Sequence, residues 1–422
     1  MLRRIALISD HASPLAAAGG VDSGGQNVYV AQVARHLVAL GYRVDVFTRR
    51  DSPLPAEVVQ CGEGLRIIHV PAGPPEFVRK EDLLPTMQEF AAYVQSFCTR
   101  DGPYELIHAN FFMSGLVALM LKQKLGIPFV ITFHALGRVR RLYQREADQF
   151  PAERIDIEDR IVDNADGIIA ECPQDEADLL SLYRADPAKI SVIPCGFDAA
   201  EFWPIAKRFA RKTLGLAPDQ PLLLSLGRTV PRKGIDNAIL SLAWLADKHA
   251  MRPTLMVVGG NSDLPDPALT PEIARLRAIA QGENVGEQVK FVGRRSRELL
   301  KLYYSAADMF ITTPWYEPFG ITPLEAMACG TPVIGSDVGG IKYSVVDGQT
   351  GYLVSPNRPD ALAERIATLY RQPDHLKEFG RNGIRRVNRN FTWGGVTGSI
   401  ASFYRQVCGE TIEPQRRVAA LA

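Results

Sequence analysis

Short apolar runs alternate with segments whose apolar residues recur at helical spacing, and this alternation continues along most of the chain. Between the first two runs, Val30, Val33, Ala34 and Leu37 recur every three or four positions, and Gly41 stands where a helix would end. The pattern predicts strand–helix–strand units and therefore an α/β fold with a mostly parallel sheet. In the first half of the chain the expected strands are residues 4–9, 43–48, 65–70, 106–109, 128–134, 167–171 and 190–195.

A second series of strand signals begins after the polar stretch at residues 206–220. We therefore expect two doubly wound domains, residues 1–200 and 201–395, joined by a hinge near residues 196–203. A C-terminal helix at about residues 396–422 is expected to pack back on the first domain. Open parallel sheets bind ligands beyond the carboxyl ends of their strands, so the site is expected in the cleft between the domains. The second set of strands is 221–227, 254–260, 289–293, 309–313, 332–336 and 351–354.

Composition narrows the class of protein. A chain of 422 residues is too long for one ordinary core, and 46% hydrophobic with 23% charged residues is typical of globular proteins. The net charge of +1 gives no bulk electrostatic case for nucleic acid or an acidic membrane. Six scattered cysteines without a CxxC pair argue against a zinc site and for a reducing compartment. No apolar run reaches about 18 residues, so we expect a cytoplasmic protein without a transmembrane segment.

Two glycines, Gly24 and Gly25, stand between the first expected strand and a helix expected to begin around Asn27. A helix N-terminus presents unpaired N–H groups and a partial positive charge, and glycine lets an anion approach the backbone closely. The stretch is therefore a candidate phosphate site. An ordinary flexible loop is the alternative, because the dinucleotide-binding GxGxxG spacing is absent.

A cluster of cations follows the strand expected at residues 221–227. Arg228, Arg232 and Lys233 lie within six positions, and cations at the carboxyl end of a strand can neutralise a diphosphate. A solvated basic loop is the alternative interpretation of this cluster.

Two carboxylates and two histidines complete the set of candidates. Glu317 and Glu325 are separated by seven residues, and Glu325 falls one turn into an expected helix. Carboxylates beside loop amides suit a polyhydroxylated ligand, although two surface glutamates are the alternative. His134 ends an expected strand and could face the cleft, whereas His108 is the weaker candidate.

These segments together resemble the retaining glycosyltransferases of family 4, which have the GT-B fold. The resemblance extends from GGQNVYV through FHALGR, VIPCGFD and GRTVPRKGID to DGQTGYLV and FTWGGV. Its most specific part is EPFGITPLEAMACG, the E-x7-E element of that family. The implied function is transfer of a hexosyl group from a nucleotide-diphosphate sugar, bound by the second domain, to an acceptor bound by the first.

The resemblance also implies roles for individual residues on the donor side. The backbone N–H of Gly25 would meet the donor diphosphate, Arg228 and Lys233 would hold it, and Glu325 would bind the ribose. His134 would lie beneath the donor sugar, and the nucleotide base would lie near residues 292–294, with Arg294 as a donor contact. The groups expected to hold the sugar hydroxyls are Glu317 and the backbone at Phe319, Gly320 and Ile321.

On the acceptor side, GGQN, FVRKEDL and FHALGR resemble bacterial sucrose-phosphate synthases and the transferase that glycosylates inositol phosphate in mycothiol synthesis. Both use a phosphorylated acceptor, so Lys80 and Arg154 would hold the phosphate, and Gln26 and Asn27 would contact acceptor hydroxyls. Residues 109–111 depart from the inositol-phosphate pattern. This favours UDP-glucose and fructose 6-phosphate as substrates, giving sucrose 6-phosphate. The alternatives are N-acetylglucosamine transfer to inositol phosphate and another family 4 hexosyl transfer in polysaccharide or glycolipid synthesis.

The expected chemistry needs no cofactor and no magnesium ion, because fixed cations would stabilise the leaving diphosphate. No well-placed carboxylate is apparent next to His134, so we expect same-face substitution in which the leaving diphosphate takes the acceptor's proton. A sugar-phosphate phosphatase acting downstream is a candidate partner. The rival classes are a dehydrogenase or epimerase on a double Rossmann scaffold, which the missing GxGxxG disfavours, and a non-catalytic sugar-nucleotide sensor, in which damage to Lys233, Glu317 or Glu325 would be expected.

Overall fold

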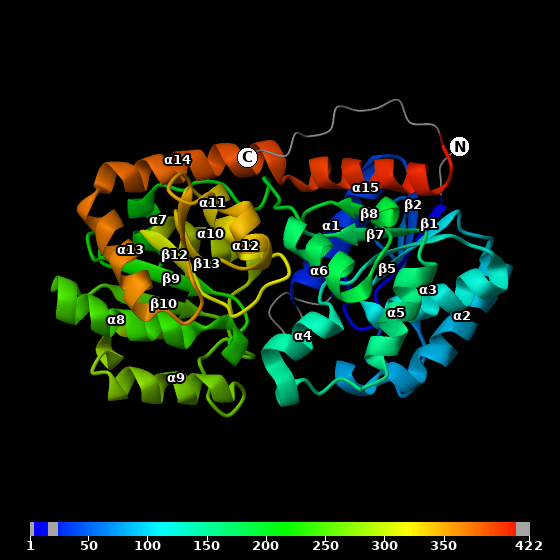
Figure 1. Ribbon diagram of the computed structural model, residues 1–422, viewed down its shortest axis with the longest axis horizontal. Helices are drawn as coiled ribbons and strands as arrows, with labels where there is room; N and C mark the ends of the chain where they lie inside the picture. Colours follow the sequence, from blue (N-terminus) through cyan, green and yellow to red (C-terminus); the bar gives the residue numbers. More distant parts are fainter. Residues whose placement is uncertain (1–3, 16–23, 411–422) are drawn as a thin grey trace.

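The computed structural model describes residues 4–15 and 24–410, and two sheets form the centres of its two domains (Figure 1). The elements of the first domain are β1 (Arg4–Ile8), α1 (Gly25–Ala39), β2 (Arg43–Arg49), β3 (Val58–Gln60), β4 (Leu65–Val70), α2 (Met87–Asp101), β5 (Leu106–Asn110), α3 (Phe112–Leu125), β6 (Phe129–Thr132), α4 (Gly137–Gln144), α5 (Arg154–Asn164), β7 (Gly167–Ala170), α6 (Pro173–Tyr183) and β8 (Ile190–Val192).

The second half of the chain follows the same alternation and ends with three consecutive helices. Its elements are α7 (Lys207–Thr213), β9 (Leu222–Leu226), α8 (Ile235–His249), β10 (Thr254–Val258), α9 (Pro271–Gly282), β11 (Val289–Gly293), α10 (Arg297–Ala306), β12 (Met309–Thr312), α11 (Ile321–Ala328), β13 (Val333–Ser336), α12 (Gly339–Ser344), β14 (Gly351–Val354), α13 (Pro359–Arg371), α14 (Pro373–Asn390) and α15 (Trp393–Val407).

The strand order confirms the predicted doubly wound α/β fold. The first sheet has the order β3-β4-β2-β1-β5-β6-β7-β8 and the second has the order β11-β10-β9-β12-β13-β14. Every neighbouring pair is parallel except β3 with β4. The order reverses between β1 and β5 in one sheet and between β9 and β12 in the other. Loops after these strands therefore diverge and leave a crevice at the carboxyl ends of both sheets.

Both faces of the first sheet are covered, which explains the unbroken apolar runs in the sequence. In β1, Ile5 and Leu7 belong to the core cluster that contains residues of α1, whereas Ala6 and Ile8 belong to the cluster that contains residues of α2 and α3. Successive strand residues point to opposite faces, so most positions of a strand covered on both sides are apolar.

The chain crosses between the domains twice, and the two crossings lie side by side. The backbone N–H of Phe197 donates to the Phe391 carbonyl at 2.8 Å, and that of Trp393 donates to the Phe197 carbonyl at 3.2 Å. A Cβ on Gly196 would come within 2.9 Å of the Trp393 ring, so glycine allows this close approach. The crossings thus form one hydrogen-bonded joint between the domains.

After the second crossing, α15 lies along the first domain (Figure 1). Its Tyr404 hydroxyl is 2.6 Å from Nδ1 of His108 on β5, and its Phe403 ring packs over Gly167 of β7. The part of the expected C-terminal helix at residues 411–422 lies outside the described residues. Among the residues that the structure describes, no helix is long and apolar enough to cross a bilayer.

Candidate active site

A cavity of about 810 Å³ lies between the two domains at the carboxyl ends of both sheets. Residues of both domains line it, so it is formed only when the domains face each other. The predicted site residues that line it are Gly25, Gln26, Asn27, Lys80, His134, Arg228, Lys233, Arg294, Glu317, Phe319, Gly320, Ile321 and Glu325.

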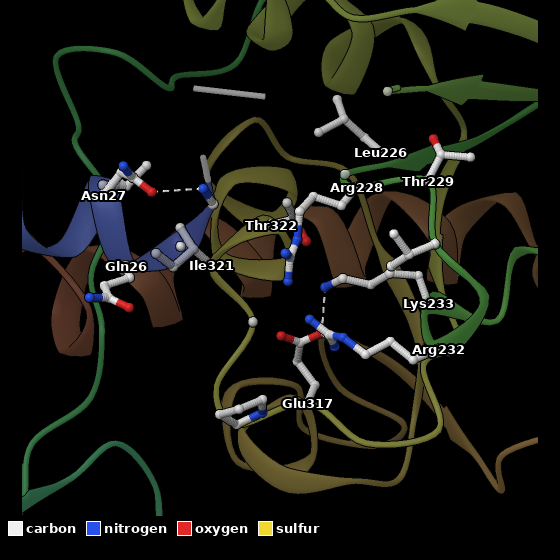
Figure 2. A pocket seen from close by; sticks show the side chains of 18 of the residues that line it. Gln26, Asn27, Leu226, Arg228, Thr229, Arg232, Lys233, Glu317, Ile321 and Thr322 are labelled. Carbon is white, nitrogen blue, oxygen red and sulfur yellow. Dashed lines mark hydrogen bonds and ion pairs between the residues drawn. The ribbon is translucent and has the colours of Figure 1, made fainter. Parts of the chain in front are cut away.

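The glycine pair directly precedes Gln26 and Asn27, which stand at the start of α1 beside Ile321 of the second domain (Figure 2). The helix begins at Gly25, two residues before the expected start. A Cβ on Gly25 would lie 3.8 Å from Ile321 Cδ1, and one on Gly24 would lie 3.7 Å from Arg228 Nε, both ordinary contact distances. Neither backbone conformation nor packing therefore requires glycine here. The space that the missing side chains leave belongs to the cavity, where a ligand would pass the amide end of α1.

The two amides after the glycines have different roles. Asn27 is buried, its Oδ1 accepts from the Gly24 N–H at 2.9 Å, and its Nδ2 donates to the Ser13 carbonyl at 2.9 Å. The loop before α1 binds both polar atoms of the Asn27 side chain, and the expected contact of Asn27 with the acceptor stays a prediction. Gln26 lines the cavity, with its Nε2 at 3.2 Å from Ser9 Oγ.

Cations and a carboxylate meet on the second-domain wall. Lys233, at the end of the short helix Pro231–Lys233, forms a direct ion pair with Glu317, which follows β12 (Figure 2). Arg232 Nη1 lies 3.4 Å from the same carboxylate. Burial by itself favours the neutral acid, but Lys233, Arg232 and Arg228 outweigh it and lower the pKa of Glu317 to about 2. Burial lowers the pKa of Lys233 to about 8, although Glu317 opposes the shift.

Glu325 lies on the first turns of α11. Gly320, with φ +88°, is the residue directly before that helix. The Glu325 side chain is 2% exposed and lines the cavity. Its Oε2 accepts from the Tyr304 hydroxyl at 2.9 Å, and its Oε1 lies 2.9 Å from Arg297 Nη1. The E-x7-E spacing thus places both glutamates at one cavity, and neither is a surface residue.

His134 follows β6 with a left-handed φ of +57°, a conformation that costs a non-glycine residue free energy. Its Nδ1 lies 3.0 Å from Glu171 Oε1 and its Nε2 lies 3.0 Å from Asn110 Oδ1. Acceptor oxygens therefore face both ring nitrogens and fix the orientation of the imidazole in the cavity wall.

The sequence analysis identified no well-placed carboxylate next to His134, but in the structure Glu171 lies there and lines the cavity. Burial alone would raise the pKa of Glu171, but His134 outweighs burial and lowers it. A sequence signal existed: Glu171 directly follows β7, the neighbour of β6 in the sheet. Residues that follow adjacent parallel strands come together at one edge.

His108 lies in the core and does not line the cavity. Its Nε2 is 2.8 Å from Thr132 Oγ1, and burial lowers its pKa to about 3. His108, the weaker of the two candidate histidines, is thus part of the core of the first domain. It also belongs to the contact between this core and α15.

Arg154 is the one predicted acceptor-binding residue that is absent from the cavity wall. Its side chain is 1% exposed, lies 2.7 Å from Glu158 and stacks within 4.6 Å of the Phe150 ring. The prediction that Arg154 holds an acceptor phosphate is therefore not supported, because aromatic rings separate its guanidinium from the cavity. Arg140 of α4, which sequence reasoning missed, lines this end of the cavity together with Lys80.

The far end of the cavity lies beyond β11, where the base was expected. The backbone N–H of Arg294 donates to the Ser262 carbonyl at 2.7 Å, and the side-chain Nη1 of Arg295 donates to the Asp263 carbonyl at 2.7 Å. The loop after β10 is thus bound to the loop after β11. Within the described ranges, no group of three or more His, Cys, Asp or Glu side chains is placed to hold a metal ion.

Two doubly wound domains facing each other across a ligand cavity define the GT-B class of glycosyltransferases. Residues 206–386 match the family model of the group 1 glycosyl transferases, and residues 24–196 match that of the glycosyl transferase 4-like domain. The chain belongs to glycosyltransferase family 4. This confirms the predicted fold and reaction class.

Relatives with assigned names cover almost the whole chain. The chain is 35% identical to D-inositol 3-phosphate glycosyltransferase 2 of Catenulispora acidiphila, over 95% of this chain and 94% of that protein. It is 36% identical to the D-inositol 3-phosphate glycosyltransferase of Corynebacterium efficiens, over 96% and 95% of the two chains. Among solved structures, the sucrose-phosphate synthase of Thermosynechococcus elongatus matches with a TM-score of 0.88 and 36% identity, over 96% of this chain and 99% of that one.

Proposed function

We propose that the protein transfers a glucosyl group from UDP-glucose to fructose 6-phosphate, with retention of the anomeric configuration. The distribution of charge along the cavity supports the general form of this reaction, transfer from a nucleotide-diphosphate sugar to a phosphorylated acceptor. Arg228 and Lys233 lie on the second-domain wall, with the amide end of α1 nearby, and Lys80 and Arg140 lie on the first-domain wall. A diphosphate at one end and an acceptor phosphate at the other match these two sets of cations.

The proposed role of the donor-side cations is to stabilise the leaving diphosphate. As the anomeric bond breaks, negative charge develops on the diphosphate, and Lys233, Arg228 and the N–H groups of α1 are already oriented toward it. Glu317 and the start of α11 hold the sugar hydroxyls, Glu325 holds the ribose, and Arg294 lies at the base. A cavity enclosed by both domains excludes water and so limits hydrolysis of the donor.

We retain same-face substitution as the proposed route to retention, although Glu171 lies beside His134. The Glu171 side chain is 3% exposed, and its Oε1 is shared by His134 and the Cys195 thiol at 3.0 Å. A nucleophile needs an exposed oxygen free to reach the anomeric carbon, whereas the leaving diphosphate already lies beside the acceptor hydroxyl. A glycosyl adduct trapped on Glu171 and located by peptide mass analysis would overturn this route.

A second candidate function is transfer of N-acetylglucosamine to inositol phosphate. The names of the relatives at 35% and 36% identity favour it. Phe111, which has a positive φ of +83° and lines the cavity, belongs to the stretch 109–111 that departs from the pattern expected of that enzyme. Both candidates use a phosphorylated acceptor, so Lys80 and Arg140 serve either one.

The two candidate functions can be distinguished by incubating the purified protein with each pair of donor and acceptor. The molecular masses of the products are then measured. UDP-glucose with fructose 6-phosphate is expected to give a hexosyl-hexose phosphate, and fructose without phosphate should react far more slowly. Turnover confined to UDP-N-acetylglucosamine with inositol phosphate would replace the first candidate by the second. Turnover of a donor with acceptors that carry no phosphate, as fast as with the phosphorylated acceptors, would contradict both.

The pKa of Lys233 leads to a pH prediction. Lysine loses its positive charge as the pH rises through its pKa, which burial lowers to about 8 in the free protein. Because kcat/KM reports groups of the free enzyme, kcat/KM for the donor should fall above about pH 8, approaching tenfold per pH unit. Arginine stays charged at these pH values, so Lys233→Arg should move this alkaline limb upward. An unchanged limb in Lys233→Arg would assign it to another group.

A further inference from the structure

One arginine that the proposed function leaves unassigned lies between two carboxylates from different parts of the chain. Arg297 begins α10 and lines the cavity. Its Nη1 lies 2.9 Å from Glu325 Oε1, and its Nε donates to Glu201, which belongs to the first crossing between the domains. Its Nη2 is buried and has no hydrogen-bond partner among the described residues.

We propose that Arg297 is the positioning residue of the donor ribose site, holding the Glu325 carboxylate toward the ribose and tying it to the crossing segment through Glu201. The proposal rests on the assignment of Glu325 as the ribose ligand.

The hydrogen-bond capacity of Glu325 supports this role. A carboxylate accepts about four hydrogen bonds, and here the Tyr304 hydroxyl donates to one oxygen while Arg297 Nη1 forms an ion pair with the other. Two donors fix the plane of the carboxylate, and the remaining lone pairs stay available for the two ribose hydroxyls. Without Arg297, the Tyr304 hydroxyl alone would hold a buried carboxylate that could then rotate.

Arg297 itself packs against a residue of the first crossing between the domains. Its guanidinium carbon lies 4.8 Å from the centre of the Phe202 ring, and that ring packs edge-on against Tyr304 at 6.0 Å. Both groups that hold Glu325 therefore rest on Phe202, next to Glu201 in the chain.

The contacts of Glu201 continue into the first domain. Gln32 Nε2 lies 3.5 Å from Glu201 Oε1 and 3.3 Å from Asp198 Oδ2. Gln32 belongs to α1, the helix whose first residue, Gly25, is the proposed diphosphate contact. The path from α1 to Glu325 through Gln32, Glu201 and Arg297 therefore joins the diphosphate end and the ribose end of the donor site.

The test compares the dissociation constants of UDP and 2′,3′-dideoxy-UDP by titration calorimetry, which requires no turnover and no acceptor. Hydrogen bonds to a charged group are strong, so the wild-type protein should bind UDP at least about tenfold more tightly than the dideoxy analogue. In Arg297→Met this ratio should fall close to one, because a rotated Glu325 no longer distinguishes the two ligands. A loss of fold would weaken the binding of both ligands and give no reason for the ratio of their dissociation constants to change.

Two further variants make the result specific. Arg295→Met is the matched control, because Arg295 lines the same cavity and bonds Asp263 and Tyr303; it should keep the wild-type ratio. Glu201→Gln, at a side chain that is 30% exposed, should lower the ratio at least threefold, on the order of a weakened hydrogen bond.

Each outcome decides the proposal. A wild-type ratio retained in Arg297→Met overturns it while leaving the ribose role of Glu325 intact. A wild-type ratio near one overturns the ribose role of Glu325 and this proposal with it. A ratio unchanged in Glu201→Gln overturns the link to the crossing segment.

Discussion

Replacing Lys233 with alanine is expected to lower kcat by roughly a hundredfold or more. One preorganised donor to a developing negative charge contributes about 3–4 kcal/mol to transition-state stabilisation. Lys233 is the cation in direct contact with Glu317, so its loss also leaves Arg232 as the nearest partner of that carboxylate. The measurement is single-turnover transfer from the donor, with the donor dissociation constant determined separately.

Lys290→Ala provides the control for Lys233→Ala. Lys290 is an exposed residue of β11 in the same domain and does not line the cavity, so its removal should leave the transfer rate within about twofold. A Lys233→Ala variant that retained most of the wild-type rate would show that the leaving diphosphate is stabilised elsewhere.

Replacing Gly25 with valine is expected to abolish transfer while both domains stay folded. A Cβ at Gly25 would meet only Ile321, at 3.8 Å, so the first added atom causes no clash with the protein. The two methyl groups beyond it would occupy the space over the amide end of α1. A displacement of about 1 Å in a reacting group can cost a hundredfold in rate, so the loss should be at least of that order.

The series Gly25→Ala and Gly25→Val should give graded losses, measured as kcat/KM for the donor beside thermal unfolding curves. Gly282→Val is the matched control, because no atom lies within 4 Å of a Cβ at Gly282, which ends α9 away from the cavity. Full activity in Gly25→Val would show that the diphosphate does not pass this backbone.

Local patterns predicted most of the fold correctly. The strands at 65–70, 289–293 and 351–354 have the predicted bounds, because most of their residues are apolar and turn residues flank them. The missed strand, β3, has only three residues at the edge of the sheet, and its residues are exposed or half-buried. Edge strands of this kind carry no apolar signal.

The candidate site was predictable where its residues are close in the sequence. The glycine pair, the cluster around Lys233 and the spacing of Glu317 and Glu325 could all be read from short segments, and each lines the cavity. The hydrogen bonds of Asn27 to the loop before α1 were not predictable, because an amide that caps a loop and an amide that faces a ligand look alike in a sequence. The role of Asn27 depends on where Ser13 lies.

By itself, the sequence determined the order of strands and helices, the two-domain division and the residues that end strands near a ligand. These are local properties, set by periodicity, helix ends and the spacing of motifs. Only the tertiary structure decided that Glu171 lies beside His134, that Arg297 holds Glu325, and that Arg140 lines the cavity in place of Arg154. The first two pairings depend on strand order and helix packing, which bring together residues many positions apart. Whether Arg140 or Arg154 lines the cavity depends on the side of an aromatic cluster on which each guanidinium lies.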